Sequence, residues 1–468
     1  MNDIVYALKI FEKFLYKIVF FRVFDVPFLI LWALCGYCFC FIRSKAINIR
    51  YFINAFSILL GFNLIKSEDV CSKKAVSHYQ AFATAIAGSI GLGAIVGSVF
   101  AIKMGGPGSL LWIVIFGILS MSTKFFEVTL GFRFRTEDKL GYLGGPFAYI
   151  KYAFERIGFI KFGKFSAQFY AVIMTFNVIL GILLFQSNQV ISATKQINNF
   201  FINKEFIISG FYAVLIGIII FGGLKRISNF VSGLVPVMML IYLSIVFFTI
   251  FYYKENILSS LSLIVNDAFT NSKSGIFGGI IGVVIVAFNR ALYTCEAGIG
   301  TSSIAHSGTN EKYPAKVGLV AMIEPIFDTC IMCFLSGFVI IVSKAYIIYP
   351  DVTGIELAVL AFESSAHYNL FLISTCSILF GLSTIISYSY YLEIAITYLL
   401  GRNIKNTYVI RIISIVIIFL SACFADPSVL IGICDIFFIL LTIPNFMAIY
   451  LLNDIVILEL KKYINNAL

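Results

Sequence analysis

Runs of about 20 apolar residues recur from one end of this 468-residue chain to the other. A helix of that length spans the hydrocarbon layer of a bilayer, and water cannot solvate many such surfaces on one chain. Apolar residues make up 60% of the chain and charged residues only 12%, about half the charged fraction of a soluble domain. The sequence therefore predicts an all-α polytopic membrane protein. It excludes a soluble enzyme, a nucleic-acid-binding protein and a disordered chain.

The apolar runs divide the chain into spans and loops. We predict eleven spans, at residues 23–42, 81–102, 108–132, 165–194, 206–224, 229–253, 276–300, 315–343, 366–400, 406–424 and 428–452. The ninth run could form one long tilted helix or two short ones. Residues 1–22 are predicted to form an amphipathic helix at the membrane surface, because Lys9, Lys13 and Lys17 recur every four residues. Residues 453–468 form a predicted cytoplasmic tail.

Basic residues are distributed unevenly between the two sets of loops. Loops after odd-numbered spans, with the C-terminal segment, hold 23 Lys and Arg, whereas the other loops and the N-terminus hold 10. Cytoplasmic loops carry an excess of Lys and Arg. This bias places the C-terminus in the cytoplasm and the N-terminus outside, and the alternation also favours eleven spans.

Glycines interrupt two of the predicted spans. The second span contains Gly88, Gly91, Gly93 and Gly97, and the seventh contains Gly275, Gly278, Gly279 and Gly282. Glycine weakens a helix, but small residues also allow close helix packing. The two glycine-rich stretches lie five spans apart, so they have opposite orientations. Glycine-interrupted helices at matching positions of two inverted halves favour a transporter binding site made by discontinuous helices.

Polar and charged residues also lie inside the predicted spans. They are Lys124, Glu127, Gln186, Asn188, Glu296, Glu324, Asp328, Ser383, Thr384 and Asp435. Carboxylates at this depth are costly unless they are paired or face a cavity. Lys124 and Glu127, three residues apart, are predicted to form a structural pair or to line the interface, and we assign no role to His306. Three scattered histidines without an H-E-x-x-H motif argue against a zinc enzyme, and we predict no enzymatic activity.

Nine short motifs, in order along the chain, resemble those of the alanine/glycine:cation symporter family. They are S-H-Y-Q-A-F-A-T-A from Ser77, G-G-P-G from Gly105, T-K-F-F-E from Thr123, G-G-P-F-A-Y-I from Gly144, G-G-L-K-R-I from Gly222, Arg290 to Gly300 in place of R-G-L-F-S-N-E-A-G-x-G, G-L-V-A-M from Gly318 with Asp328-Thr329, Ser383-Thr384-Ile385, and Pro444-Asn445. The resemblance extends from about residue 23 to 452.

This resemblance implies a five-plus-five inverted-repeat transporter core preceded by one extra span at 23–42. The repeats would cover residues 78–253 and 276–452, and the first helix of each would be discontinuous. It further implies sodium-coupled symport of alanine or glycine across a bacterial inner membrane, with the lipid bilayer as surroundings and no cofactor beyond sodium.

The resemblance also implies two sets of site residues. The substrate set is Gly91, Leu92, Gly93, Ala94, Gln186, Asn188, Gly278, Gly279 and Tyr388. The sodium set is Ala87, Ile90, Ser383 and Thr384. The substrate carboxylate is expected at the backbone amides of Leu92 and Gly93, where the outer half of the second span begins.

Several residues depart from the family pattern. The family reads G-T-G-N-I-A-G where this chain has Leu92 and Ala94, so a hydroxyl and a carboxamide are missing from the expected site. Tyr388 replaces a tryptophan, and Glu324 replaces a small or apolar residue. Two alternatives therefore stay open: a transporter with another amino-acid substrate or cation coupling, and a transport-inactive receptor.

Overall fold

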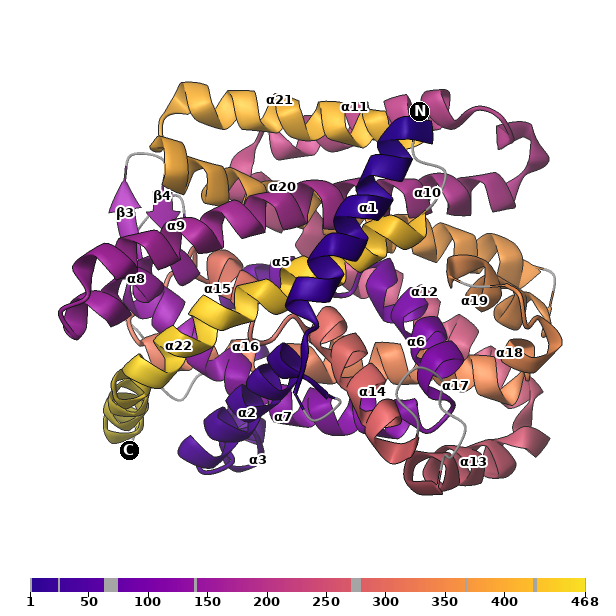
Figure 1. Cartoon of the computed structure of the whole chain (residues 1–468), viewed down its shortest axis with the longest axis horizontal. Coiled ribbons are helices and arrows are strands. Elements are labelled where there is room, and N and C mark those ends of the chain that lie inside the picture. The colour runs from indigo at the N-terminus through magenta and orange to yellow at the C-terminus, as the bar shows by residue number, and fades with distance from the viewer. Residues whose placement is uncertain are drawn as a thin grey trace.

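The computed structural model describes residues 2–23, 26–62, 75–138, 141–270, 279–352, 354–366, 368–423 and 427–467. Nearly all of these residues are helical, and the helices lie side by side with most of them running across the view in Figure 1. Two short antiparallel hairpins complete the fold: β1 (Arg22–Val23) with β2 (Val26–Pro27), and β3 (Thr136–Asp138) with β4 (Gly141–Leu143). The predicted all-α fold is confirmed.

Among the described residues up to Thr270 there are thirteen α-helices, one π-helix and two 3₁₀ segments. They are α1 (Asn2–Val19), α2 (Phe28–Arg43), α3 (Ile47–Arg50), α4 (Phe52–Leu59), α5 (His78–Ser89), α6 (Leu92–Gly105), α7 (Ser109–Arg133), α8 (Pro146–Arg156), α9 (Ile160–Phe176), the π-helix η1 (Asn177–Leu183), α10 (Leu184–Ile197), η2 (Asn199–Phe201), α11 (Glu205–Ile220), α12 (Gly223–Tyr252), η3 (Lys254–Asn256) and α13 (Ile257–Thr270).

The second half continues with α14 (Gly279–Cys295), α15 (Thr301–His306), α16 (Pro314–Ala321), the π-helix η4 (Ile326–Cys333), α17 (Phe334–Val342), α18 (Ala345–Ile348), α19 (Gly354–Glu363), α20 (Tyr368–Leu400), α21 (Ile404–Leu420), η5 (Ser421–Cys423) and α22 (Pro427–Ala467). The ninth predicted span is thus one continuous helix, α20. Residues 453–467, which were predicted as a cytoplasmic tail, form the C-terminal end of helix α22.

Within the described ranges, seven continuous helices are long and apolar enough to cross a bilayer. The pair α5 and α6, bent by 40° at a short break, makes an eighth candidate. The apolar helices α2, α11 and α14 are shorter, with 16, 16 and 17 residues. A polytopic membrane protein is therefore confirmed, while the count of eleven spans and the inverted repeat stay predictions.

Contacts between loops show which loops share a face. The loop before α5 pairs with the loop after α15 through a parallel bridge between Val76 and Thr309. Arg402, after α20, contacts Asp138 of β3 at 3.1 Å. These loops follow odd-numbered predicted spans, and β3, β4, α8 and the C-terminus lie together at the left of Figure 1. The predicted alternation of loops agrees with these contacts.

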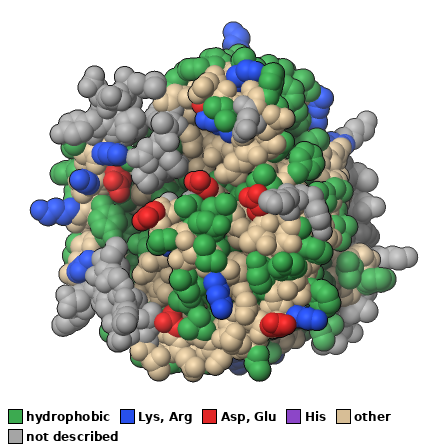
Figure 2. Space-filling model, turned by 90° about the vertical axis from the view of Figure 1, so that its right-hand side faces the viewer, with side chains coloured by type: hydrophobic (Ala, Val, Ile, Leu, Met, Phe, Trp, Pro, Cys, Tyr) green, Lys and Arg blue, Asp and Glu red, His purple; other side chains and the backbone are tan. Residues whose placement is uncertain are grey.

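Loops after even-numbered spans meet at the opposite end. Lys103 Nζ donates to the carbonyl oxygens of Tyr349 and Pro350, at 2.9 and 2.7 Å. The backbone amide of Gly108 donates to Asp267 at 2.7 Å. Figure 2 shows this end, where Lys, Arg, Asp and Glu are scattered among hydrophobic side chains. Which of the two ends faces the cytoplasm stays a prediction from the basic residues.

The predicted N-terminal amphipathic segment forms helix α1, which crosses in front of α22 in Figure 1. A Cβ atom on Gly432 of α22 would lie 2.6 Å from Glu12 Oε1, so α1 packs closely on α22 at this glycine. The structure therefore adds a packing partner to the predicted surface helix.

Candidate functional site

The second predicted span is broken at Ile90 and Gly91. Helix α5 begins with a capping box at Ser77 and ends at Ser89, and Gly91 is extended, with φ −86° and ψ −169°. Helix α6 starts at Leu92. The last carbonyls of one helix and the first amides of the next have no partner within their own helices. The predicted discontinuous helix is present here, and it exposes backbone donors and acceptors inside the protein.

Two other helices meet this break closely. A Cβ atom on Gly91 would lie 2.5 Å from Thr384 Oγ1 of α20 and 2.9 Å from Gln186 Nε2 of α10. Real Cβ atoms do not approach other atoms that closely, so only glycine fits without displacing its neighbours. The break is therefore enclosed by one hydroxyl and one carboxamide from helices distant in sequence.

Three of the four predicted sodium residues lie together. Thr384 Oγ1 donates to the carbonyl oxygen of Ala87 at 2.9 Å, and Ser383 Oγ donates to the same oxygen at 3.4 Å. All three residues are buried. Ile90 follows at the end of α5, where its amide donates to the Ile86 carbonyl at 2.6 Å. These groups are uncharged hard oxygens of the kind that bind alkali and alkaline-earth cations.

The predicted substrate residues near this break are mostly buried. Leu92, Ala94 and Tyr388 are 0% exposed. The Leu92 side chain points toward α20, where its Cδ1 would lie 3.3 Å from a Cβ atom on Gly381. The Tyr293 ring covers Gly93, since a Cβ atom there would lie 2.4 Å from Tyr293 Cε1. The walls around the start of α6 therefore stand close together.

The remaining predicted substrate residues are placed differently. Gln186 is buried and its Oε1 has no hydrogen-bond partner. Asn188 is half-buried and accepts a hydrogen bond from Gln189 Nε2 at 3.3 Å. Gly278 lies outside the described residues. Gly279 is the first residue of α14, and a Cβ atom there would have no neighbour within 4 Å.

The break in the seventh span lies elsewhere than predicted. Helix α14 ends at Cys295 and α15 begins at Thr301, and three of the intervening residues, Glu296, Gly298 and Gly300, have φ of 54°, 82° and 93°. Positive φ favours glycine, so this pair of glycines permits the turn. Helix α14 runs without interruption from Gly279 to Cys295, while Gly275 and Gly278 of the predicted glycine-rich stretch lie outside the described residues.

A buried charge cluster supports this second break. Lys124 Nζ of α7 lies 3.0 Å from Glu324 Oε2 and also donates to Ser302 Oγ of α15. Ser302 Oγ donates to the same Glu324 oxygen at 2.7 Å, and His306 Nε2 lies 2.7 Å from Glu324 Oε1. The Lys124, Glu324 and His306 side chains are 0% exposed. A buried ion pair needs such additional hydrogen bonds to offset its desolvation.

The interpretation of Lys124 and Glu127 as a pair was wrong. Glu127 Oε1 instead accepts a hydrogen bond from Asn445 Nδ2 of α22 at 2.6 Å. The same Asn445 nitrogen donates to the Gly298 carbonyl at 2.8 Å, which is inside the second break. Spacing along one helix suggested the wrong partner, since the true partner of Lys124 is 200 residues away.

Other buried acids also accept local hydrogen bonds, although Asp328 Oδ2 has no partner. Thr301 Oγ1 donates to Glu296 at 2.6 Å, and Thr329 Oγ1 donates to Asp328 at 2.6 Å. Arg290 and Asp435 form an ion pair between α14 and α22. In the described part of the chain no three His, Cys, Asp or Glu residues are grouped as they would be to hold a metal ion.

Comparison with known proteins identifies relatives over nearly the whole length. The sequence model of the sodium:alanine symporter family matches residues 10–467. The chain is 29% identical to the probable sodium/glutamine symporter GlnT of Bacillus subtilis, over 84% of this chain and 79% of that one. It is 29% identical to the sodium/alanine symporter AgcS of Methanococcus maripaludis, over 87% of this chain and 88% of that one. It is 30% identical to the putative sodium/proton-dependent alanine carrier YrbD of Bacillus subtilis, over 71% and 70%.

Proposed function

Because this chain belongs to the sodium:alanine symporter family, we propose that it carries a small neutral amino acid, alanine or glycine, together with sodium across the inner membrane. Transport proceeds by alternating access, in which ligand occupancy shifts the protein between outward-open and inward-open states. The single observation that carries this proposal is the broken span at Gly91, enclosed by Thr384 and Gln186.

The substrate carboxylate binds at the start of α6. The first amides of a 14-residue helix lack partners within the helix, and its N-terminal end attracts negative charge. Leu92 and Gly93 supply these amides through the backbone, so the apolar Leu92 side chain does not remove them. Gln186 Oε1, which is buried without a partner, accepts a hydrogen bond from the substrate ammonium.

Sodium binds between α5 and α20. The Ser383 and Thr384 hydroxyls each lie within 3.4 Å of the Ala87 carbonyl oxygen. A cation between them takes all three oxygens as ligands, and the hydroxyl protons turn away. The Ile90 carbonyl and the substrate add further oxygens. The side chain of residue 94 is not among these proposed ligands. The absence of the family's carboxamide at Ala94 therefore does not remove a ligand from this sodium site.

The close walls of the site favour a small substrate. Gly91 and Gly93 have no space for a methyl group, and the Leu92 side chain occupies the space beside Gly381. Alanine or glycine fits such a site better than a larger amino acid does. The apolar side chains at positions 92 and 94 support the alternative of a less polar substrate, and that alternative is decided by a screen of substrates.

Uptake by reconstituted protein tests the proposal. We expect proteoliposomes to accumulate labelled alanine or glycine under an inward sodium gradient. Uptake at the same rate with and without sodium would contradict sodium coupling. Accumulation of another amino acid would show that the substrate is neither alanine nor glycine. Binding of an amino acid without flux would instead indicate a receptor. A screen of the twenty amino acids with and without sodium distinguishes these outcomes.

A further inference from the structure

Two successive contacts between α14 and α22 close over the start of α6. The ring of Phe438 meets the ring of Tyr293 edge-on, with centroids 5.3 Å apart, and Tyr293 covers Gly93. Three residues earlier on each helix, Arg290 and Asp435 form their ion pair. Both helices begin after an even-numbered predicted span. The ion pair therefore lies beyond the ring pair, on the side of the end where those loops meet.

Helix α1 adds a third layer to this closure. The next position three residues earlier on α22 is Gly432, where a Cβ atom would lie 2.6 Å from Glu12 Oε1 of α1. Positions three apart form an inclined row on a helix surface, so the three contacts of α22 follow one another. Tyr16 of α1 also interacts electrostatically with Asp435 and Arg290. Helix α1 therefore lies beside the ion pair, where it crosses α22 in Figure 1.

Helix α1 is anchored more firmly at its C-terminal end than along its length. Val19 and Phe20 at this end are buried. Leu15, one turn earlier, is half-buried and packs against an apolar cluster of α22, formed by Val429, Ile433 and Phe437. Phe14 points away and is 62% exposed. A rotation about the buried end would therefore separate α1 from α22 at the cost of few contacts.

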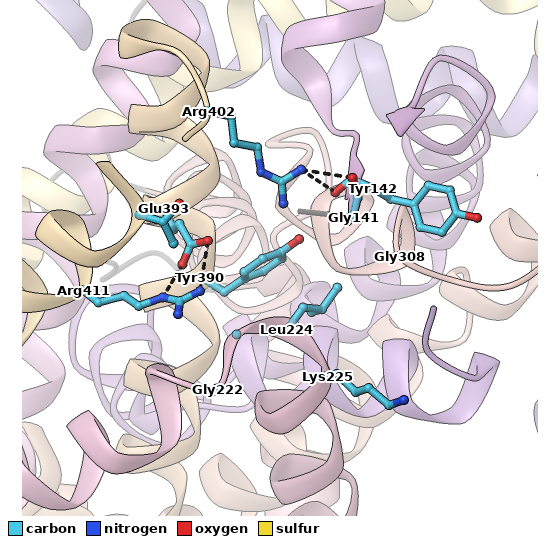
Figure 3. A pocket seen from close by; sticks show the side chains of 12 residues that line it. Gly141, Tyr142, Gly222, Leu224, Lys225, Gly308, Tyr390, Glu393, Arg402 and Arg411 are labelled. Carbon is cyan, nitrogen blue, oxygen red and sulfur yellow. Dashed lines mark hydrogen bonds and ion pairs between the residues drawn. The ribbon is translucent and has the colours of Figure 1, made fainter. Parts of the chain in front are cut away.

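The charges at this contact also favour its release. The Asp435 carboxylate repels Glu12, whereas lysines of α1 itself attract Glu12. Contacts at the opposite end of the molecule pair unlike charges instead, as Arg411 Nε and the Glu393 carboxylate do at 2.8 Å (Figure 3). Like charges repel and unlike charges attract across the same distance. The contact between α1 and α22 is thus held by apolar packing and opposed by two acids.

We propose that α1 is a movable cover over the contact between α14 and α22. While α1 is docked on α22, it holds the Arg290–Asp435 pair and the rings behind it closed. Helix α1 must leave α22 before the start of α6 becomes accessible from this end. The role of this opening in uptake rests on the proposed transport function, whereas the effect of α1 on the accessibility of Tyr293 does not.

Hydroxyl-radical footprinting of the purified full-length chain tests the cover directly, because the oxidation rate of Tyr293 reports its access to solvent. Leu15→Ala removes apolar contact with α22 and should raise this rate about fivefold. Glu12→Gln removes the repulsion and should lower the rate about twofold. Phe14→Ala, on the exposed side of α1, is the control and should leave the rate unchanged. A helix that only adds stability would not give opposite changes in Leu15→Ala and Glu12→Gln.

A reversible cross-link tests whether α1 must move. A Cβ atom on Gly432 would lie 3.3 Å from Glu12 Cγ, so Glu12→Cys with Gly432→Cys brings two thiols within reach of a disulfide. Oxidation should lower alanine uptake by proteoliposomes about tenfold or more, and reduction should restore it. Each single-cysteine variant, treated with the same oxidant, is a control.

Two results would overturn the proposal. One is an equal oxidation rate of Tyr293 in the unchanged chain, Leu15→Ala and Glu12→Gln. The other is a disulfide that forms and leaves both uptake and the oxidation of Tyr293 unchanged. Absence of uptake in the unchanged chain would contradict the transport function instead, and the footprinting would still decide whether α1 is a cover.

Discussion

The two broken spans differ in how their interruptions are stabilised. A Cβ atom on Gly91 would lie nearest to the Thr384 hydroxyl and the Gln186 carboxamide, and neither group is charged. Charged side chains contact the segment that follows the break at Glu296 to Gly300. Lys124 pairs with Glu324 and donates a hydrogen bond to Ser302 of α15. Both leave helix ends inside the membrane protein, but at the second the backbone carbonyls of Ala297, Gly298 and Ile299 all accept hydrogen bonds from side chains.

This difference separates a binding site from a structural support. Polar backbone inside a membrane must be satisfied. Asn445 reaches the Gly298 carbonyl, so the second break is satisfied by the protein itself. At the first break the Gln186 Oε1 atom lacks a partner, and the amides at the start of α6 wait for an anion. The proposed ligand site is therefore the first break, and the second break is stabilised by contacts within the protein.

The largest expected effect is at the second break. Lys124→Met leaves the Glu324 carboxylate buried without its ammonium partner, which should lower the free energy of unfolding by about 3–5 kcal/mol. The double change with Glu324→Met removes both charges and should restore most of that loss. Thermal unfolding in detergent measures both, and Lys161→Met, on an exposed part of α9, serves as the control. A single variant as stable as the original chain would contradict a structural role.

A methyl group at the first break should affect transport. Gly91→Ala forces a Cβ atom against Thr384 and Gln186, and such overpacking costs about 1–3 kcal/mol. We expect the initial rate of alanine uptake to fall about tenfold. Gly233→Ala is the matched control, because its Cβ atom would meet nothing within 4 Å. Unchanged uptake by Gly91→Ala would exclude this break from the transport site.

Removing the Ser383 and Thr384 hydroxyls of α20 should weaken sodium binding. With Ser383→Ala and Thr384→Ala together, we expect the sodium concentration for half-maximal uptake to rise about tenfold, since two hard ligands are lost. Alanine binding measured without sodium should change little. Ser389→Ala, a buried serine further along the same helix, should have no effect on sodium dependence. An equal loss of sodium dependence in the double variant and in Ser389→Ala would show that the ion lies elsewhere.

The smallest expected effect is on selectivity. Leu92→Thr with Ala94→Asn introduces the family's polar groups at the start of α6, and one pocket group of this size changes discrimination by about tenfold or less. The ratio of alanine to leucine uptake should rise. Leu92→Ile, which keeps the site apolar, is the control. If the ratio stays constant in both, neither side chain faces the substrate.

Local sequence predicted the first break and missed part of the second. Four glycines between residues 88 and 97 weaken a helix, and this effect does not depend on contacts with the rest of the chain. In the seventh span the same reasoning favoured Gly279, whereas the turn depends on positive φ at Gly298 and Gly300. A glycine count does not distinguish a helix end from a turn. The A-G-I-G sequence from Ala297 was the available signal.

The buried charge cluster was beyond sequence reasoning for a different reason. Lys124 and Glu324 are brought together by the packing of α7 against α16, and spacing along one helix says nothing about that. His306 likewise gains its partner only through the turn after α14. By contrast, the all-α fold and the alternation of loops follow from apolar length and basic residues, which are summed over many positions.

The bridge between Val76 and Thr309 has a mechanical consequence. The Val76 amide donates to the Gly308 carbonyl at 3.0 Å, and the Asn310 amide donates to the Val76 carbonyl at 3.1 Å. One of these loops leads into α5, which ends at the first break, and the other follows α15, which begins at the second break. The bridge therefore links helices α5 and α15, each of which adjoins one of the two breaks. We expect the two helices to move together as one rigid unit. Hydrogen exchange at these two amides should slow or quicken together when alanine and sodium are added.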